Sequence, residues 1–274
     1  MAARKSVLTR YLARALASLL VLTCVFIVAG ALWTRSTTRT HRIRYRLKPW
    51  EGGVTPARLE RTRDVLADRL ASMAEMLRLR GGDVRTIGRD LVEVEISCQD
   101  DPTAALAWLT MPARVEFRLL YAGLDAAARA SAEPEEYETK VYRTQRYDLV
   151  RAPEMEQVEE DYLVEREPVL RIGDFERVQM DTVGLHRTII LTFRLGEPNA
   201  EAFAAATALH VGREMAMLVD GEMFFPPKTI ESAVTAGSVQ AQGYFYTTPL
   251  KKLVCVLNSG GLPGRLEPVS PEDG

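Results

Sequence analysis

The sequence predicts an α+β protein behind one N-terminal transmembrane helix, and three observations support this prediction. Residues 15–34 form an uncharged apolar run that no later part of the chain matches. After it, several short segments alternate apolar and polar residues, which is typical of strands with one exposed face. Between these segments, apolar residues recur at helical spacing. Helices and strands are therefore expected to mix in the remainder of the 274-residue chain.

A transmembrane helix is predicted over Ala15–Thr34. These twenty residues carry no charge, and at about 1.5 Å each they span about 30 Å, the thickness of a bilayer's hydrocarbon layer. A cleaved signal is the competing interpretation, because Ala29-Gly30-Ala31 has the small residues of a cleavage site. The run exceeds the ~7–15 residues of a signal peptide, so we favour a retained anchor. We expect the N-terminus in the cytoplasm and the large domain outside it, since large domains cross largely regardless of charge.

The next predicted elements are a strand and a helix. In Arg42–Lys48, apolar residues alternate with basic ones, which predicts a strand with one exposed face. Thr55-Pro56 is typical of a helix start, with a capping hydroxyl followed by proline in the first turn. The apolar stripe of this helix consists of Leu59, Leu66, Leu70, Met73 and Leu77. We expect the helix to end at Gly81-Gly82.

Two strands, a short helix and a fourth strand are predicted to follow. The strands Val84–Ile87 and Val92–Ser97 are joined by a turn at Gly88-Arg89-Asp90. A short helix starts at Asp101-Pro102 and runs to about Leu109. The fourth strand, Arg114–Leu119, again alternates charged and apolar residues.

Strand, helix, strand, strand, helix, strand is the order of a ferredoxin-like fold. In that topology the first and third strands are neighbours. We therefore expect the arginines of the first strand to face Glu93 and Glu95 of the third as pairs of opposite charge. Pattern and charge agree on one sheet, the predicted ferredoxin-like base over residues 40–122.

Residues 123–174 carry a weaker signal. Ala126 to Ala132 predicts a loose helix or a loop, and the rest is rich in acidic residues at irregular spacing. An acidic binding surface or metal site is one interpretation, and a solvated, partly flexible insertion is the other. We favour the insertion, because no Asp-rich metal-loop motif occurs.

Ordered elements are predicted again after residue 175. Ile189, Leu191 and Phe193 alternate in a strand, and Asn199 is predicted to cap a helix through His210. The remaining predicted elements are a strand over Arg213–Asp220, a turn at Asp220-Gly221 into Glu222–Phe225, a strand near Ser238–Gln242 and a helix over Pro249–Leu257.

Charge is unevenly distributed along the chain. The first 48 residues contain ten Lys or Arg and no acidic residue, which leaves 25 basic and 37 acidic residues from Pro49 onward. A domain this acidic is a poor candidate for binding nucleic acid, because that affinity depends on neutralising phosphates. The basic stretch after the predicted helix has two interpretations, contact with anionic lipid headgroups or a solvated first strand.

No residue pattern predicts catalysis, a cofactor or a metal site. The sequence has no nucleophile elbow, Walker loop, His-Glu-x-x-His or dinucleotide-binding motif. His41, His186 and His210 lack metal-ligand spacing. A Cys98–Cys255 bridge is one interpretation in an oxidising compartment, and two unpaired thiols is the one that we favour. We therefore expect a binding or mechanical role.

Two regions contain short segments in a fixed order and spacing. In the later region these are Phe203, Thr207, Met217-Leu218-Val219-Asp220-Gly221, Pro226-Pro227, Gly237, Gly243-Tyr244-Phe245 and Gly261-Leu262-Pro263. In the earlier region they are Leu66–Arg69, Gly88–Ile96, Asp101-Pro102 and Ala113–Arg118. Over residues 40–122 and 175–268, the chain resembles the first periplasmic domain of the SecD family, the membrane-protein partner of the Sec preprotein translocase. The resemblance implies a ferredoxin-like base with an inserted α+β head subdomain.

The chain also departs from the pattern of this family. It lacks the glycine-rich motif after the first helix, and Thr247-Thr248 stands where the family has an acidic pair. The family continues into five more membrane helices with a proposed proton-coupling acid, whereas this sequence stops at Gly274. Ala15–Thr34 contains no ionisable residue that could replace that acid. We therefore expect no proton-driven pulling by this chain alone.

The resemblance implies a division of the chain and a function. The expected division is a cytoplasmic tail (1–14), a transmembrane helix (15–34), the base (40–122), an acidic and partly flexible insertion (123–174), the head (175–242), a return segment to the base (243–268) and a tail (269–274). The expected function is a non-catalytic accessory protein of preprotein translocation, single-pass in the inner (plasma) membrane, with its large domain periplasmic. Expected partners are the Sec translocon, SecF-like or SecD-like membrane subunits, unfolded preproteins and membrane lipid.

Four aromatic residues are the expected partner contacts: Phe224, Phe225, Tyr244 and Phe245. The alternative hypothesis is a structural module of another envelope complex that kept the SecD-type domain.

Overall fold

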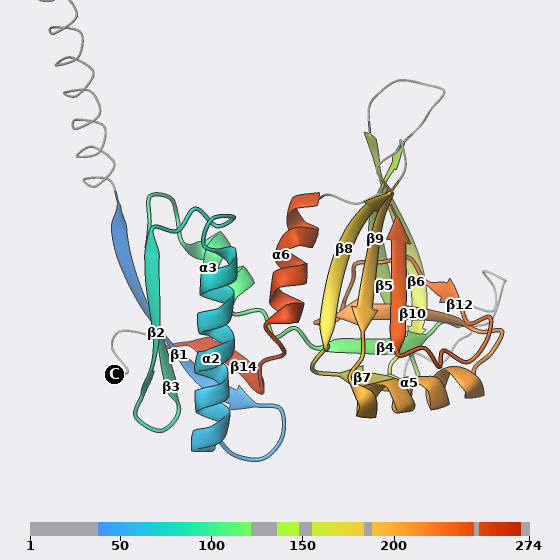
Figure 1. The fold of residues 1–274 in the computed structure, drawn as a ribbon, viewed down its shortest axis with the longest axis horizontal. Helices are drawn as coiled ribbons and strands as arrows, with labels where there is room; N and C mark the ends of the chain where they lie inside the picture. Colours follow the sequence, from blue (N-terminus) through green and yellow to red (C-terminus); the bar gives the residue numbers. More distant parts are fainter. Residues whose placement is uncertain (1–37, 122–135, 148–154, 184–187, 244–246, 270–274) are drawn as a thin grey trace, which may run out of the picture.

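The computed structural model describes residues 38–121, 136–147, 155–183, 188–243 and 247–269. The predicted segments Ala15–Thr34 and Ala126–Ala132, and the residues His186, Tyr244 and Phe245, lie outside the described residues. Within these described ranges, no helix has the length and apolar character needed to cross a membrane. The described residues form two lobes with a helix between them (Figure 1).

The first lobe is a four-stranded antiparallel sheet with two helices on one face (Figure 1). Its strands, in the order β14-β1-β3-β2, are β14 (Gly264–Pro268), β1 (Arg39–Pro49), β3 (Leu91–Cys98) and β2 (Gly81–Ile87). The helices are α2 (Pro56–Met73) and α3 (Thr103–Leu109). The start of α2 confirms the prediction, because the Thr55 side chain accepts a hydrogen bond from the Arg58 N–H at 3.3 Å.

Ion pairs between β1 and β3 confirm the predicted neighbours in this sheet. The register sets Arg42 opposite Glu95 and Arg44 opposite Glu93. The Nε atoms of these arginines lie 2.6 Å from Glu95 and 3.0 Å from Glu93. Arg85 on β2 completes the set from the other side, at 2.9 Å from Glu93. Opposite charges therefore fix the register of the exposed face while apolar residues occupy the other.

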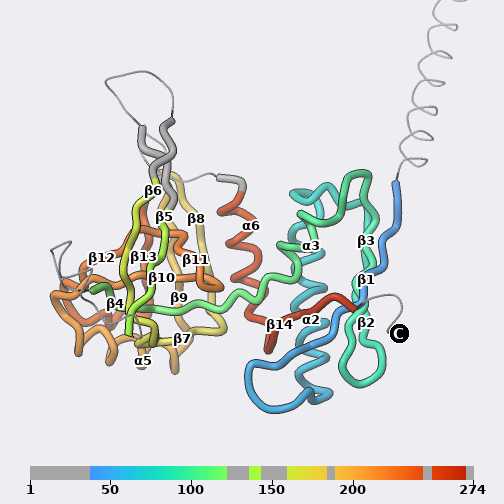
Figure 2. Tube along the Cα trace, turned by 180° about the vertical axis from the view of Figure 1, so that it is seen from behind, coloured from blue at the N-terminus to red at the C-terminus, as the bar shows by residue number. Residues whose placement is uncertain are grey.

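The second lobe contains two sheets and a helix. The larger sheet has the order β6-β5-β11-β10-β4-β7, with β12 on β10. Its strands are β4 (Val115–Leu119), β5 (Tyr137–Tyr147), β6 (Met155–Glu165), β7 (Leu170–Ile172), β10 (Glu214–Val219), β11 (Glu222–Met223) and β12 (Lys228–Thr229). The smaller sheet, in the order β13-β9-β8, consists of β13 (Ser238–Gly243), β9 (Thr188–Arg194) and β8 (Arg177–Val183). Helix α5 (Glu197–Leu209) belongs to this lobe, and α6 (Thr247–Asn258) lies between the lobes (Figures 1 and 2).

The fourth predicted strand forms, but its predicted sheet is wrong. Val115–Leu119 pairs with β10 and β7 in the second lobe. The place beside β1 is taken by β14, at the end of the described chain. Alternation within a strand shows which side chains share a face, but it does not show which sheet receives the strand.

The segment predicted as a loose insertion contains a long hairpin. β5 and β6 pair in register from Tyr137 with Glu165 to Tyr147 with Met155. Tyr142 and Val164 are buried in a small second core with Leu218 and Met223. The stretch was predicted as a solvated, partly flexible insertion with no strand assigned to it, and β5 and β6 are two strands of the larger sheet that this prediction did not contain.

Two predicted helix boundaries are wrong. Gly81-Gly82 begins β2 and does not end α2, which stops at Met73. A Cβ on Gly82 would lie 2.7 Å from the Glu95 carbonyl oxygen, so this glycine permits close pairing of β2 with β3. Helix α5 is capped by Gly196, and the Asn199 side chain instead donates to the Asp174 carbonyl oxygen at 3.1 Å.

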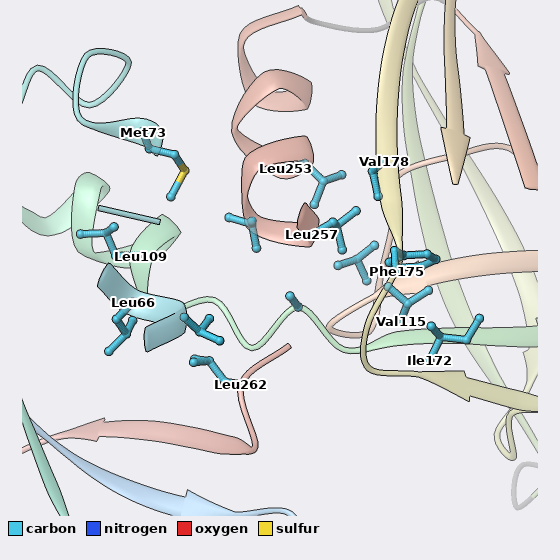
Figure 3. Close-up of a cluster of buried hydrophobic side chains, with 14 of the residues drawn as sticks. Leu66, Met73, Leu109, Val115, Ile172, Phe175, Val178, Leu253, Leu257 and Leu262 are labelled. Carbon is cyan, nitrogen blue, oxygen red and sulfur yellow. The ribbon is translucent and has the colours of Figure 1, made fainter. Parts of the chain in front are cut away.

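One apolar core extends from the first lobe into the second (Figure 3). In Figure 3, Leu66 and Leu109 lie on the side of the first lobe, and Val178 and Ile172 on the side of the second. Leu253 and Leu257 of α6 point between them, and all of these residues are at most 2% exposed. Each such burial contributes about 1.5–3 kcal/mol, so the shared core holds the lobes together.

Candidate functional site at the lobe junction and on the second lobe

The two lobes are joined by two chain crossings. The outgoing crossing runs from the end of α3 to β4, and the return crossing runs from the end of α6 to β14 (Figures 1 and 2). The Leu262 N–H of the return crossing donates to the Pro112 carbonyl oxygen of the outgoing one at 2.9 Å. These crossings set the position of the second lobe relative to the first.

A fully buried arginine joins both crossings. Arg69 on α2 has no exposed surface, and its guanidinium donates to the carbonyl oxygens of Leu109 at 2.9 Å, of Met111, and of Gly260 at 2.8 Å. Burial lowers the pKa of Arg69 to about 10, and the nearby charge of Asp220 opposes this shift. The group therefore stays ionised at neutral pH, where charged donors make stronger hydrogen bonds than neutral ones.

The sequence contains a signal for this arginine that the prediction missed. Arg69 lies three residues after Leu66 and four before Met73, in the middle of the apolar stripe of α2. A charged residue in that position must be paired when it is buried.

Asp220 fixes the outgoing crossing from the other lobe. It lies in the turn between β10 and β11, with φ +51°, and its carboxylate accepts hydrogen bonds from the backbone N–H groups of Ala113 at 2.9 Å and Arg114 at 2.8 Å. Ala113 also has a positive φ of +62°. Burial raises the pKa of Asp220, and these two N–H donors and the charge of Arg69 oppose that shift. The turn therefore anchors the point where β4 begins.

Asp174 anchors the return crossing. Its carboxylate accepts from the Gly261 N–H at 3.1 Å and from the Arg61 guanidinium of α2 at 2.7 Å. Gly260 has φ +87°, and a Cβ there would lie 2.9 Å from an Asp174 carboxylate oxygen. The return crossing therefore requires glycine both for its backbone angle and for its close approach.

The buried carboxylate of the larger sheet is held by arginines. Glu116 on β4 lies 2.5 Å from Arg118 and 3.3 Å from each of Arg171 and Arg114. Burial raises the pKa of Glu116, but the hydrogen bonds and charges of the arginines outweigh it and hold the pKa below its usual range. This side chain is therefore an ionised structural group, unsuited to donating a proton near neutral pH.

In the described part of the chain, no three His, Cys, Asp or Glu side chains lie close enough together to hold a metal ion. Cys98 on β3 and Cys255 on α6 are free thiols. His41 lies on β1, and His210 follows α5.

Of the four aromatic residues predicted as partner contacts, the structure describes Phe224 and Phe225, and these two differ in burial. Phe225 is 2% exposed and packs edge-on against Phe193 at 5.7 Å between ring centroids. It is a core residue in this structure, so its ring is not exposed to a partner. Phe224 is partly buried at the edge of the same core, with its ring centroid 6.5 Å from that of Phe225. Phe224 thus remains the aromatic residue of this segment that can meet a partner.

Comparisons with known proteins converge on one family. Residues 145–264 match the model of the SecDF P1 head subdomain. The protein translocase subunit SecD of Acidaminococcus fermentans is 36% identical over 80 residues, which are 29% of this chain and 19% of that protein. SecD of Syntrophobacter fumaroxidans is 24% identical over 182 residues, which are 66% of this chain and 33% of that protein. The chain thus spans a third or less of the length of these relatives.

Two solved structures share the fold. One is a membrane component, SecDF, that enhances protein export, with a TM-score of 0.57 at 19% identity over 84% of this chain and 98% of that chain. The other is SecDF in a super-membrane-facing form, with a TM-score of 0.55 at 20% identity over 84% of this chain and 30% of that chain. The family model, the relatives and the fold agree: the chain is similar to the SecD family, with residues 145–264 matching the SecDF P1 head subdomain.

Proposed function

We propose that this chain is an accessory protein of preprotein translocation, whose extracytoplasmic domain contacts exported chains or the Sec translocon. The observation that carries this proposal is the match of residues 145–264 to the SecDF P1 head subdomain, together with the SecDF fold. Under this proposal the second lobe is the head and the first lobe is a ferredoxin-like base.

The same proposal assigns a place in the cell. Ala15–Thr34 would anchor the chain as a single-pass helix in the inner membrane, with residues 1–14 in the cytoplasm. The large domain would then be periplasmic, close to lipid and to SecF-like or SecD-like membrane subunits. The uncharged character of this segment over a bilayer's thickness supports the assignment.

We propose a binding role without catalysis. The two described carboxylates with the least exposed surface, Glu93 and Glu116, are each paired with arginines, and their pKa values are lowered. Burial raises the pKa of Asp220, but two backbone N–H groups hold its carboxylate at the start of β4. Groups held in this way stabilise sheets and offer little to acid–base chemistry.

Photo-crosslinking from the head tests the proposal. A photoreactive phenylalanine analogue replaces Phe224 in the full-length chain, and a secretory precursor is arrested during export in the native membrane. We expect a crosslink to the precursor or to a translocon subunit that depends on the arrest. The analogue at the buried Phe225 is the matched control, and it should crosslink only within the chain.

Affinity purification of the chain in mild detergent tests the alternative, a scaffolding role in another envelope complex. Recovery of another envelope assembly without Sec subunits, together with no arrest-dependent crosslink from residue 224, would contradict the proposal and support a scaffolding role.

A further inference from the structure

Strand β13 (Ser238–Gly243) is an open edge of the smaller sheet. On one side it pairs with β9 along its full length, from Ser238 with Arg194 to Gly243 with Ile189. Within the described residues no strand pairs with its other side. A strand in this position presents a row of backbone donors and acceptors to any extended chain.

The register identifies which backbone groups face outward. The Leu195 N–H donates to the Gly237 carbonyl oxygen at 2.9 Å, just before β13 begins. Hydrogen-bonded and non-hydrogen-bonded pairs alternate along an antiparallel ladder. Val239 and Ala241 therefore bond to β9, and the N–H and C=O groups of Ser238, Gln240 and Gln242 face away from it.

The other edge strands of the described chain are protected. On the edge of β8, the Asn258 side chain accepts from the Val178 N–H at 2.7 Å and donates to the Val178 carbonyl oxygen at 2.9 Å, and the strand also contains Arg177 and Asp181. The remaining edges contain charged residues or proline: Asp83 and Arg85 on β2, Arg265 and Pro268 on β14, Glu159 and Asp161 on β6, Arg171 on β7 and Lys228 on β12. Natural proteins use these devices to prevent unwanted strand addition.

β13 has none of this protection. Its sequence, Ser-Val-Gln-Ala-Gln-Gly, contains neither charge nor proline over all six residues. On the exposed face of the sheet, Gln240 lies opposite Thr192 and donates to it at 3.4 Å, and Arg194 lies opposite Ser238 at the start of the strand. A guest strand would therefore meet backbone groups and neutral polar side chains along most of β13, with one arginine beside its Ser238 end.

We propose that the β13 edge binds an extended segment of an unfolded polypeptide as an added strand. Main-chain hydrogen bonds to Ser238, Gln240 and Gln242 would supply the affinity, and the uncharged edge strand would leave that affinity only weakly dependent on the guest sequence. This inference rests on the proposed function, because a protein that handles many exported chains needs such sequence tolerance. Pairing of this edge with the same edge of a second copy is the alternative, and the test below distinguishes such a dimer from binding of an unfolded guest.

The test uses a permanently unfolded probe. Reduced, carboxymethylated α-lactalbumin is titrated into the full-length chain in detergent, with native α-lactalbumin as the folded control. Binding is measured by fluorescence anisotropy, and the contact is located by hydrogen–deuterium exchange. We expect slower exchange at Gln240 and Gln242 when the unfolded probe binds, and no change with the folded one.

Gln240→Pro is the decisive variant. Proline removes the outward N–H without touching a backbone hydrogen bond to β9, so the sheet should fold and the affinity should fall about tenfold or more, the equivalent of one or two lost hydrogen bonds. Gln240→Val is the matched control and should bind as the wild type does. Should the proline variant fail to fold, the double variant Gln240→Lys, Gln242→Lys replaces it, because lysines guard natural edges.

Three outcomes overturn the inference. If Gln240→Pro binds the unfolded probe as tightly as the wild type does, the head binds chains elsewhere, and the proposed function survives. If hydrogen–deuterium exchange at β13 slows when the protein concentration is raised without any probe, and the chain sediments as a dimer, the strand bound at this edge is that of a second copy. If the wild type binds no unfolded probe and residue 224 gives no crosslink, both this inference and the proposed function fail.

Discussion

The guanidinium of Arg69, on the first long helix, donates a 2.8 Å hydrogen bond to the carbonyl oxygen of Gly260, which follows the last helix. The two residues belong to segments 191 positions apart. The same side chain bonds to Leu109 and Met111 at the outgoing crossing. A single buried charge therefore joins α2 to both connections between the lobes.

Replacement of Arg69 tests this arrangement. Arg69→Met keeps much of the volume but leaves three carbonyl oxygens without their donor, so we expect a loss of about 2–4 kcal/mol in the free energy of unfolding. Urea unfolding of the full chain in mild detergent measures it. Arg63→Met is the control on the same helix, because Arg63 is partly exposed and its ion pairs within the described residues are with Glu60 and Asp64 of that helix. Equal effects of the two variants would contradict the role of Arg69.

Gly264 should tolerate no side chain. A Cβ there would lie 2.3 Å from the Lys48 carbonyl oxygen of β1, so Gly264→Ala must displace β14 from the sheet. We expect a loss of about 2 kcal/mol or more, in the range of strained backbone positions. Gly81→Ala is the control, since a Cβ there meets no atom within 4 Å. A Gly264→Ala variant as stable as Gly81→Ala would show that β14 does not pair with β1 in this register.

The two adjacent phenylalanines should differ sharply. Phe225 is buried against Phe193, so Phe225→Ala should lower the free energy of unfolding by about 3–5 kcal/mol. Phe224→Ala should cost about 1 kcal/mol, because its ring is only partly buried. Its main effect should be on the crosslinking of neighbouring positions to a partner. Similar losses of stability for both variants would place Phe224 in the core and remove it as a contact residue.

Protonation of Glu93 should account for part of the fall in the free energy of unfolding at acidic pH. The hydrogen bond from Arg44 lowers the pKa of Glu93, burial opposes this shift, and Arg85 adds to the lowering. A carboxylate with a lowered folded-state pKa stabilises the fold above its unfolded-state pKa, and this contribution is lost as the pH falls through the folded-state value. Between pH 6 and pH 3, Glu93→Gln should therefore lose less stability than the wild type. Parallel urea curves at several pH values measure the difference, and identical pH profiles would contradict the assignment.

The local features of the first lobe could be predicted from the sequence. Alternation in Arg42–Lys48 and around Glu93 defined two strands with charged outer faces, and opposite charges identified them as neighbours. The observed pairs of Arg42 with Glu95 and Arg44 with Glu93 confirm that prediction. Here local pattern and electrostatics depend on the same few residues, so they determine the register together.

Long-range placement could not be predicted in the same way. The alternation of Val115, Phe117 and Leu119 describes a strand with one buried face, but its partner β10 begins 95 residues after Leu119. Asp220, which follows β10, accepts hydrogen bonds from the Ala113 and Arg114 N–H groups and so holds the start of β4 beside β10. The β5–β6 hairpin was missed because β6 is rich in acidic residues, and because its burial involves only a few side chains such as Tyr142 and Val164.

The candidate contact surface was only partly predictable. The aromatic residues at 224 and 225 predicted a contact segment, but sequence alone does not show which of two neighbours points into the core. The open edge of β13 has no sequence motif, since it is defined by the strands that do not pair with it. Such a surface is visible only when the whole sheet order is known.

Arrest-dependent photo-crosslinking from residue 224, with residue 225 as the buried control, is the measurement that tests the central claim most directly. A SecD-like role in export predicts a crosslink from residue 224 to the arrested precursor or to a translocon subunit, and none from residue 225 to either. The absence of such a crosslink from residue 224, in membranes where the chain is abundant and the precursor is arrested, would contradict that role.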